Sequence, residues 1–127
     1  MGNTMTWQVE FTEQFEEWWE TLSDRQQEAL DARVLLLAEG GPALGRSLVD
    51  AIGSSRHPNM KELRASSDGL LRVLFAFDPR RTAILLLGGD KSGQLDEWYR
   101  TAVPLADDLY DEHLVDLKEE ERGNAQD

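Results

Sequence analysis

Cysteine is absent from the 127 residues, which excludes disulfides and thiolate zinc sites. Lysine and arginine are scarce: 13 of them stand against 25 aspartates and glutamates, and the formal net charge is −12. So acidic a chain is unsuited to general nucleic-acid binding. No apolar run reaches the roughly 20 residues of a membrane span, and the N-terminal stretch lacks the basic and apolar regions of a signal peptide. We therefore expect a cytoplasmic protein without a membrane partner.

The charged residues are unevenly spread along the chain. Residues 1–45 and 101–127 each carry a net charge of −7, whereas residues 46–100 carry +2. A locally basic surface is therefore available to an anion although the whole chain repels polyanions. The basic side chains concerned are Arg56, Lys61, Arg64, Arg72, Arg80, Arg81 and Lys91.

The length predicts a single domain over residues 1–127, with flexible ends at 1–5 and 119–127. Thr12 and Ser23 are the expected helix N-caps. The fold class is α+β in the order β-α-α-β-β-β-α: an N-terminal strand and a helical hairpin packed on a small, largely antiparallel sheet, and a C-terminal helix. The predicted elements are a strand at 6–11, two helices between Thr12 and Gly40, a loop at 45–59, strands at 60–65, 69–78 and 82–88, and a helix from 94 that is interrupted or restarted at Pro104.

Alternation along the strands separates their side chains into two faces. One face of strand 69–78 is apolar and is expected to meet the helices; it carries Leu71, Val73, Phe75 and Phe77. Arg72 points to the opposite face, which we expect to be open. In the strand before it, Lys61 and Leu63 share one face, and Glu62 and Arg64 share the other. An open face with isolated arginines either binds an anion or is a solvated surface whose arginines pair with acids.

Two other features have competing interpretations. The loop GGDKSG (88–93) lacks the glycine spacing of a phosphate-binding P-loop and is read as a simple connection between a strand and a helix. His57 is either a general acid or base that titrates near neutral pH, or a loop histidine with a local hydrogen bond. His113 is expected to pack or cap, and the two histidines do not form a helical metal-binding pair.

The middle of the chain resembles a known family. The block from NMKELR (59–64) through LRVLFAFDP (71–79) to LLLGGDKSG (85–93), followed by EWY (97–99), is similar to the RelE/HigB superfamily of type II toxins, particularly its phage-derived HigB-like branch. The resemblance covers roughly residues 7–117 and depends on the order and spacing of these pieces. It implies a RelE-like fold.

The resemblance also implies an activity. Many members of the family are ribosome-dependent mRNA endoribonucleases that inhibit translation without a metal or other cofactor. In such a reaction a ribose 2′-OH attacks the adjacent phosphorus, which requires a base, cations for the charged intermediate and an acid for the leaving oxygen. Carried over by position, the catalytic candidates are Arg64 and Arg72 as phosphate-binding cations, Lys61 as the base, Lys91 as a further cation, Tyr99 for stacking or proton transfer, and His57 as an alternative acid or base.

The partners implied by the resemblance are a cognate helix-turn-helix antitoxin, the ribosome and mRNA, with operator DNA bound only through the antitoxin. Two alternatives remain. In the first, the chain is a catalytically inactive toxin-fold binding module that pairs only with an antitoxin or another protein. This alternative is motivated by Lys61 standing alone where RelE has a Lys-x-Lys pair, and by the net charge of −12. Otherwise it is a small α+β domain with an unrelated role.

Overall fold

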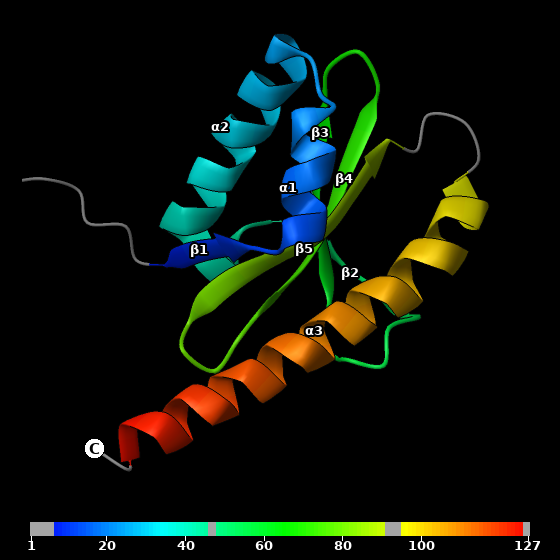
Figure 1. Ribbon diagram of the computed structural model, residues 1–127. Coiled ribbons are helices and arrows are strands. Elements are labelled where there is room, and N and C mark those ends of the chain that lie inside the picture. Colours follow the sequence, from blue (N-terminus) through cyan, green and yellow to red (C-terminus); the bar gives the residue numbers. More distant parts are fainter. Residues whose placement is uncertain (1–6, 46–47, 91–94, 126–127) are drawn as a thin grey trace, which may run out of the picture.

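The computed structural model describes residues 7–45, 48–90 and 95–125 (Figure 1). Its elements follow one another as expected, with one strand and one 3₁₀ helix added. They are β1 (Gln8–Phe11), α1 (Glu13–Glu20), α2 (Asp24–Gly40), η1 (Gly41–Ala43), β2 (Val49–Ala51), β3 (Lys61–Ser66), β4 (Leu70–Phe77), β5 (Thr82–Asp90) and α3 (Leu95–Ala125). The predicted α+β fold class is confirmed.

The five strands form one sheet in the order β1-β5-β4-β3-β2. β1 is parallel to β5, and the other neighbours are antiparallel. β2 corrects the prediction that residues 45–59 are all loop. It has three residues and pairs from Val49 opposite Leu63 to Ala51 opposite Lys61. A strand this short is too brief for alternation to reveal.

Both predicted N-caps are confirmed. The Thr12 hydroxyl accepts a hydrogen bond from the Phe15 amide at 3.0 Å and donates one to the Leu86 carbonyl at 2.7 Å. Ser23 and Gln26 form a capping box at the start of α2. These caps satisfy amides that the first turn of a helix leaves without partners. The Thr12 bond also fastens the start of α1 to β5.

The sheet has a hydrophobic core on each face. α1 and α2 cover the first face, and Leu71, Val73 and Phe75 are fully buried against them, as alternation predicts (Figure 1). The expectation that the opposite face is open is wrong. α3 crosses it, and Leu74 and Ala76 are 0% exposed in a second core that this helix completes.

α3 is also continuous where an interruption was expected. Pro104 lies inside the helix and is exposed to solvent. Its neighbours Ala102, Val103 and Ala106 are buried against the sheet. This packing offsets the backbone hydrogen bond that proline removes. None of the helices in the described ranges is both long enough and apolar enough to span a bilayer.

Two adjacent glycines let tryptophans approach both faces of β5. A Cβ on Gly88 would lie 2.1 Å from the ring of Trp18, and one on Gly89 would lie 2.1 Å from Nε1 of Trp98. Successive strand residues point to opposite faces, so Trp18 of α1 and Trp98 of α3 lie on either side of the same strand end. Gly89 is also the partner of Arg72 across the sheet. Trp98 therefore packs beside the arginines on the α3 face.

Candidate functional site

Four polar side chains meet on the α3 face of the sheet, near the start of that helix. Arg64 of β3 and Arg72 of β4 are direct partners in the antiparallel ladder. Glu62 lies two residues before Arg64 and therefore on the same face. Tyr99 reaches the group from α3. We call these residues, Glu62, Arg64, Arg72 and Tyr99, the Glu62 cluster.

The Glu62 carboxylate holds the cluster together. The residue is only 2% exposed. Its Oε1 accepts a hydrogen bond from Nε of Arg64 at 2.8 Å and lies 3.8 Å from Nε of Arg72. Its Oε2 accepts a hydrogen bond from the hydroxyl of Tyr99. A buried carboxylate requires such partners, because an unpaired charge in the interior is strongly disfavoured.

The two arginines differ in their surroundings. Nη2 of Arg64 also binds Asp50 of β2 at 3.0 Å, and the side chain is 33% exposed. The hydrogen bond to Glu62 raises the pKa of Arg64. Arg72 is more enclosed, at 12% exposed, and its Nη1 donates to the Leu71 carbonyl at 2.8 Å. Its buried Nε has no hydrogen-bond partner among the described residues, a rare condition that marks a position for scrutiny.

Tyr99 is a proton donor in this environment. Burial, and then the hydrogen bond to Glu62, raise its pKa to about 12. The phenol is therefore neutral at physiological pH and cannot act as a base there. Its ring also packs edge-on against Trp98, with the two ring centroids 5.1 Å apart, a separation typical of interacting aromatic pairs.

Lys61 lies on the other face of the sheet. It lines a hollow of about 250 Å³ with η1, β2 and Phe77, which belong to the side covered by α2. The alternation of β3 thus separates Lys61 from Arg64 and Arg72. The structure does not bring the predicted base and the predicted phosphate-binding cations together. Lys91, the further predicted cation, lies outside the described residues.

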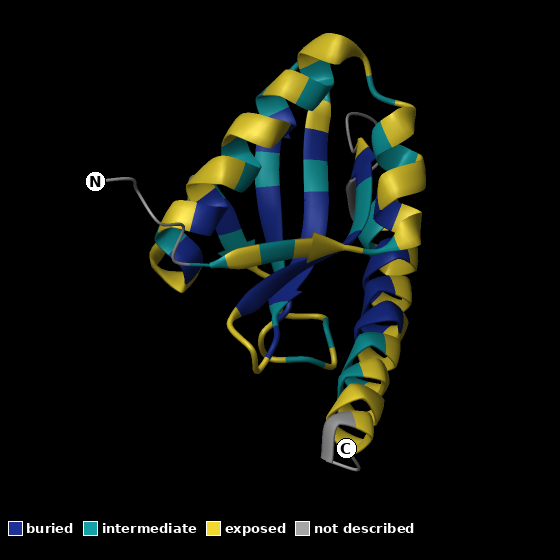
Figure 2. Cartoon of the chain, turned by 60° about the vertical axis from the view of Figure 1, so that its left-hand side comes forward, coloured by how far each residue is buried: buried dark blue, intermediate teal, exposed yellow. Residues whose placement is uncertain are grey.

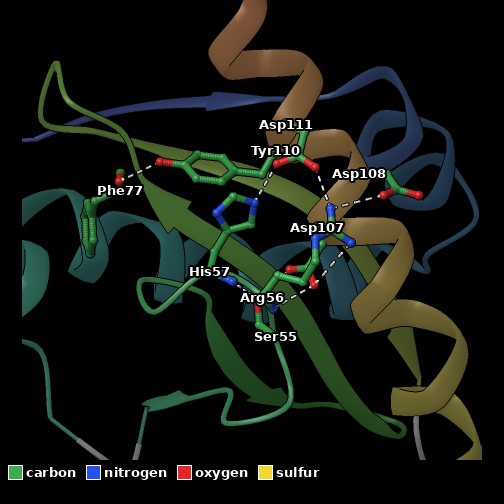
Figure 3. A network of polar contacts seen from close by, with 8 residues as sticks. All are labelled: Ser55, Arg56, His57, Phe77, Asp107, Asp108, Tyr110 and Asp111. Carbon is green, nitrogen blue, oxygen red and sulfur yellow. Dashed lines mark hydrogen bonds and ion pairs between the residues drawn. The ribbon is translucent and has the colours of Figure 1, made fainter.

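His57 belongs to a different cluster, which ties the β2–β3 loop to the middle of α3 (Figure 3). Its Nε2 contacts Asp111 at 2.7 Å, and its ring packs edge-on against Tyr110 with centroids 4.9 Å apart. Arg56 beside it binds Asp108 and Asp111. At 1.5 Å rise per residue, Asp111 lies about 18 Å along α3 from Tyr99. His57 is therefore remote from the Glu62 cluster.

The hydrogen bonds in this loop cluster hold the β2–β3 loop against α3. Asp107 is 2% exposed and accepts bonds from the Ser55 hydroxyl and the Arg56 amide. The hydrogen bond from His57 holds the pKa of Asp111 below its usual range, and Arg56 adds to this effect. Every titratable group of the cluster is thus engaged with another element of the fold.

A third polar cluster fixes the β4–β5 turn. Asp78 accepts bonds from Nε2 of His113 at 2.9 Å, from the Arg80 guanidinium and from the amides of Arg80 and Thr82. Burial alone would raise the pKa of Asp78, but these hydrogen bonds outweigh it and the pKa is lowered. Arg80 continues to Glu10 of β1 at 2.9 Å. His113 fastens α3 to this turn.

Sequence reasoning missed Glu62 as a member of the cluster and Asp50 as a partner of Arg64. The available signal was the shared strand face of Glu62 and Arg64. Asp50 gave no signal, because its strand was not predicted. Across the described ranges, no group of three or more histidines, aspartates or glutamates is arranged to hold a metal ion.

Comparison with solved structures identifies the type of fold. The isolated E. coli toxin RelE has a TM-score of 0.57 at 14% identity, covering 72% of this chain and 93% of RelE. A chain of the intact E. coli RelBE toxin–antitoxin complex gives a TM-score of 0.54 at 13% identity, covering 67% of this chain and 96% of that chain. The archaeal RelE–RelB complex of Pyrococcus horikoshii gives 0.53 at 16% identity, covering 68% and 97%. The chain has the RelE-like fold that the sequence resemblance predicts.

Sequence similarity then identifies the family. Residues 17–111 match the family described as phage derived protein Gp49-like, and the chain belongs to it. Two Mycobacterium tuberculosis proteins designated as toxins are similar. HigB2 is 43% identical over 109 residues, which are 84% of this chain and 54% of HigB2. HigB3 is 46% identical over 94 residues, which are 74% of this chain and 82% of HigB3. The chain thus spans about half the length of HigB2.

Proposed function

We propose that this chain is the toxin of a type II toxin–antitoxin system and cleaves mRNA on the ribosome. The observation that carries the proposal is the pairing of Arg64 with Arg72 on one sheet face beside the phenol of Tyr99. Two guanidinium groups on directly opposite residues of adjacent strands suit a phosphate, because each offers several hydrogen-bond donors in a fixed plane. The family membership and the RelE-like fold support the same conclusion.

In the proposed reaction, the ribose 2′-oxygen bonds to phosphorus and the bond from phosphorus to the 5′-oxygen breaks. A base accepts the 2′-OH proton, and the leaving 5′-oxygen gains a proton, which yields a 2′,3′-cyclic phosphate and a 5′-hydroxyl. Arg64 and Arg72 stabilise the additional negative charge on the phosphorane. Tyr99 donates a hydrogen bond to the phosphate or to the leaving oxygen, as its raised pKa requires.

The identity of the general base is the part of the proposal that differs most from the expectation based on the sequence. Lys61 lines the hollow beside η1 and β2 on the other face of the sheet, and His57 is held by Asp111 about 18 Å along α3 from Tyr99. Neither is placed to take a proton from a ribose bound at Arg72. Lys91, which follows β5, remains a candidate cation. The ribosome or the substrate itself supplies the base if no side chain of this chain does.

A non-catalytic module is the second candidate. Glu62 and Asp50 already bind Arg64, and Glu62 also accepts a hydrogen bond from the Tyr99 hydroxyl. A phosphate must compete with these carboxylates for the same donors. In this alternative the chain binds an antitoxin but leaves mRNA intact.

Induced expression in Escherichia coli distinguishes the two candidates. We expect the wild-type chain to stop growth and to reduce incorporation of labelled amino acids into protein. Arg72→Ala relieves both effects, whereas Arg122→Ala, which removes an exposed arginine at the far end of α3, does not. Wild-type protein that accumulates in soluble form without slowing translation contradicts the proposal and favours the non-catalytic module.

A further inference from the structure

An apolar hollow of about 390 Å³ lies on the hairpin side of the sheet, between β1, α1 and α2. Figure 2 looks onto β1, which runs between the end of α2 and the start of α1. Apolar side chains form most of the lining: Val9, Phe11, Phe15, Trp19, Val34 and Leu85. A cavity of about 150 Å³ holds one benzene ring, so this hollow has room for about two large side chains.

The walls of the hollow are helix faces. Phe15 and Trp19 are four residues apart on α1, and Asp31 and Val34 are three apart on α2, so each pair lies along one side of its helix. Phe11, at the end of the edge strand β1, is 56% exposed. Large exposed apolar side chains next to a hollow are typical of a binding surface.

The rim of this hollow is acidic. Glu16 and Asp31 line it directly. A second hollow of about 400 Å³ shares Trp19 and Asp31 with it and adds Asp24 and Glu28. Among the residues that the structure describes, no lysine or arginine lines either hollow. In the described part of the chain these four carboxylates, Glu16, Asp24, Glu28 and Asp31, form no ion pair. We call the two hollows together the β1 groove.

We propose that the β1 groove docks an amphipathic helix of the antitoxin whose apolar face is flanked by lysine or arginine. This inference rests on the proposed function for the identity of the partner. A third helix fits between two helix walls by the same packing that joins helices in bundles. The unpaired carboxylates supply the complementary charge, which favours a basic partner and disfavours an acidic one.

The β1 groove and the Glu62 cluster require partner segments of opposite charge. A partner segment that covers Arg64 and Arg72 must bring carboxylates, whereas a segment in the β1 groove must bring cations. The groove lies on the hairpin side of the sheet and the Glu62 cluster on the α3 side. Docking in the groove therefore holds the antitoxin on the toxin without itself covering the arginines.

The charge requirement is tested with two synthetic helical peptides and the full chain. Both peptides carry leucines on one face; the other face carries lysines in the first peptide and glutamates in the second. We expect calorimetry to show binding of the lysine peptide only. Glu16→Lys with Asp31→Lys weakens that binding at least tenfold. The matched double variant Glu119→Lys with Glu120→Lys, which makes the same charge change on the exposed end of α3, stays within about twofold.

The apolar requirement has its own control. Phe11→Ser removes an exposed side chain at the groove, and Val115→Ser removes one that is 54% exposed on α3. Only the first weakens binding, by several fold. Equal weakening by the two charge variants, or equal binding of the two peptides, overturns the proposal, because attraction would then depend on net charge alone.

The antitoxin itself provides the second arm. Co-expressed with the antitoxin of its own operon, the tagged Glu16→Lys/Asp31→Lys chain is expected to retain less antitoxin than the Glu119→Lys/Glu120→Lys chain. Equal retention contradicts docking in the groove. Because neither arm measures RNA cleavage, a chain that binds as expected but does not arrest growth refutes only the proposed enzymatic function. A chain that arrests growth but shows no preference for the groove refutes only the docking site.

Discussion

The hydroxyl of Tyr99 donates a hydrogen bond to Oε2 of Glu62, 37 positions earlier in the chain. This bond joins the start of α3 to β3, and it places a neutral phenol beside two guanidinium groups that the same carboxylate orients. Glu62 therefore acts as a positioning residue for the arginines. It also competes with any phosphate that binds them.

Replacing Glu62 tests its structural part. In Glu62→Ala the arginines lose their buried carboxylate, and we expect the free energy of unfolding to fall by about 2–3 kcal/mol, below the usual cost of breaking a buried pair because water screens the partly exposed Arg64. Urea unfolding followed by tryptophan fluorescence measures the loss. Glu120→Gln, at an exposed position, is the control and should change stability by less than about 0.5 kcal/mol. Equal stability of the two variants would show that Glu62 holds nothing in place.

Stability at high pH should depend on Tyr99. Its pKa is raised to about 12 in the folded chain, whereas an unfolded tyrosine titrates near 10. The folded state therefore keeps a proton that the unfolded state releases, and stability falls as pH rises from about 10 to 12. Tyr99→Phe removes the part of this dependence that Tyr99 contributes and leaves the part due to Tyr110, whose pKa is also raised by burial. Urea unfolding at pH 8, 10 and 11 checks it, and an unchanged slope in the variant would contradict the hydrogen-bonded, buried phenol.

Acid stability should depend on Asp78. The pKa of this carboxylate is lowered in the folded chain, so its contribution is complete above the ordinary aspartate pKa and is lost as pH falls through the lower folded value. Asp78→Asn is expected to be less stable at pH 7 by about 2 kcal/mol, since hydrogen bonds to a charged group are weakened. Its stability should also vary less than that of the wild type as the pH falls below about 4, the ordinary aspartate pKa. Parallel unfolding curves for the two proteins across this window would exclude the effect.

Substitution of His57 should leave the activity in place. His57 binds Asp111 and packs on Tyr110, so His57→Ala loosens the loop at 52–60 and speeds its amide hydrogen exchange. Growth arrest should stay within about twofold of wild type, whereas Tyr99→Phe should lose about 100-fold, the lower end of what a positioned proton donor contributes. A loss in His57→Ala as large as that in Tyr99→Phe would return His57 to the catalytic candidates.

Alternation predicted the faces of the central strands correctly because period-2 patterning follows directly from strand geometry. It placed Leu71 in the core and Arg72 opposite, and it put Lys61 and Arg64 on different faces. The last two were nevertheless assigned to one site by resemblance. In the structure Lys61 lies on the face that strand geometry predicts, away from Arg64.

The parts that sequence could not predict depend on contacts between distant segments. Nothing local indicates that α3 covers the Arg72 face or that Tyr99 reaches Glu62, because both depend on how the last helix packs on the sheet. From the sequence, Gly88 and Gly89 are expected only as the end of a strand and the start of the loop after it. Their role, to admit Trp18 and Trp98 against β5, appears only when the helices are in place.

Cleavage of ribosome-bound mRNA tests the central claim most directly. Purified chain is added to ribosomes programmed with a defined message, and the RNA ends are mapped and chemically identified. We predict that the wild type cuts the message on the ribosome and leaves a 2′,3′-cyclic phosphate and a 5′-hydroxyl, and that Arg122→Ala does the same. Arg72→Ala should cut more slowly by about 100-fold or more, as expected when a group that stabilises transition-state charge is removed. An intact message with the wild type, or equal cleavage by Arg72→Ala, would contradict the account.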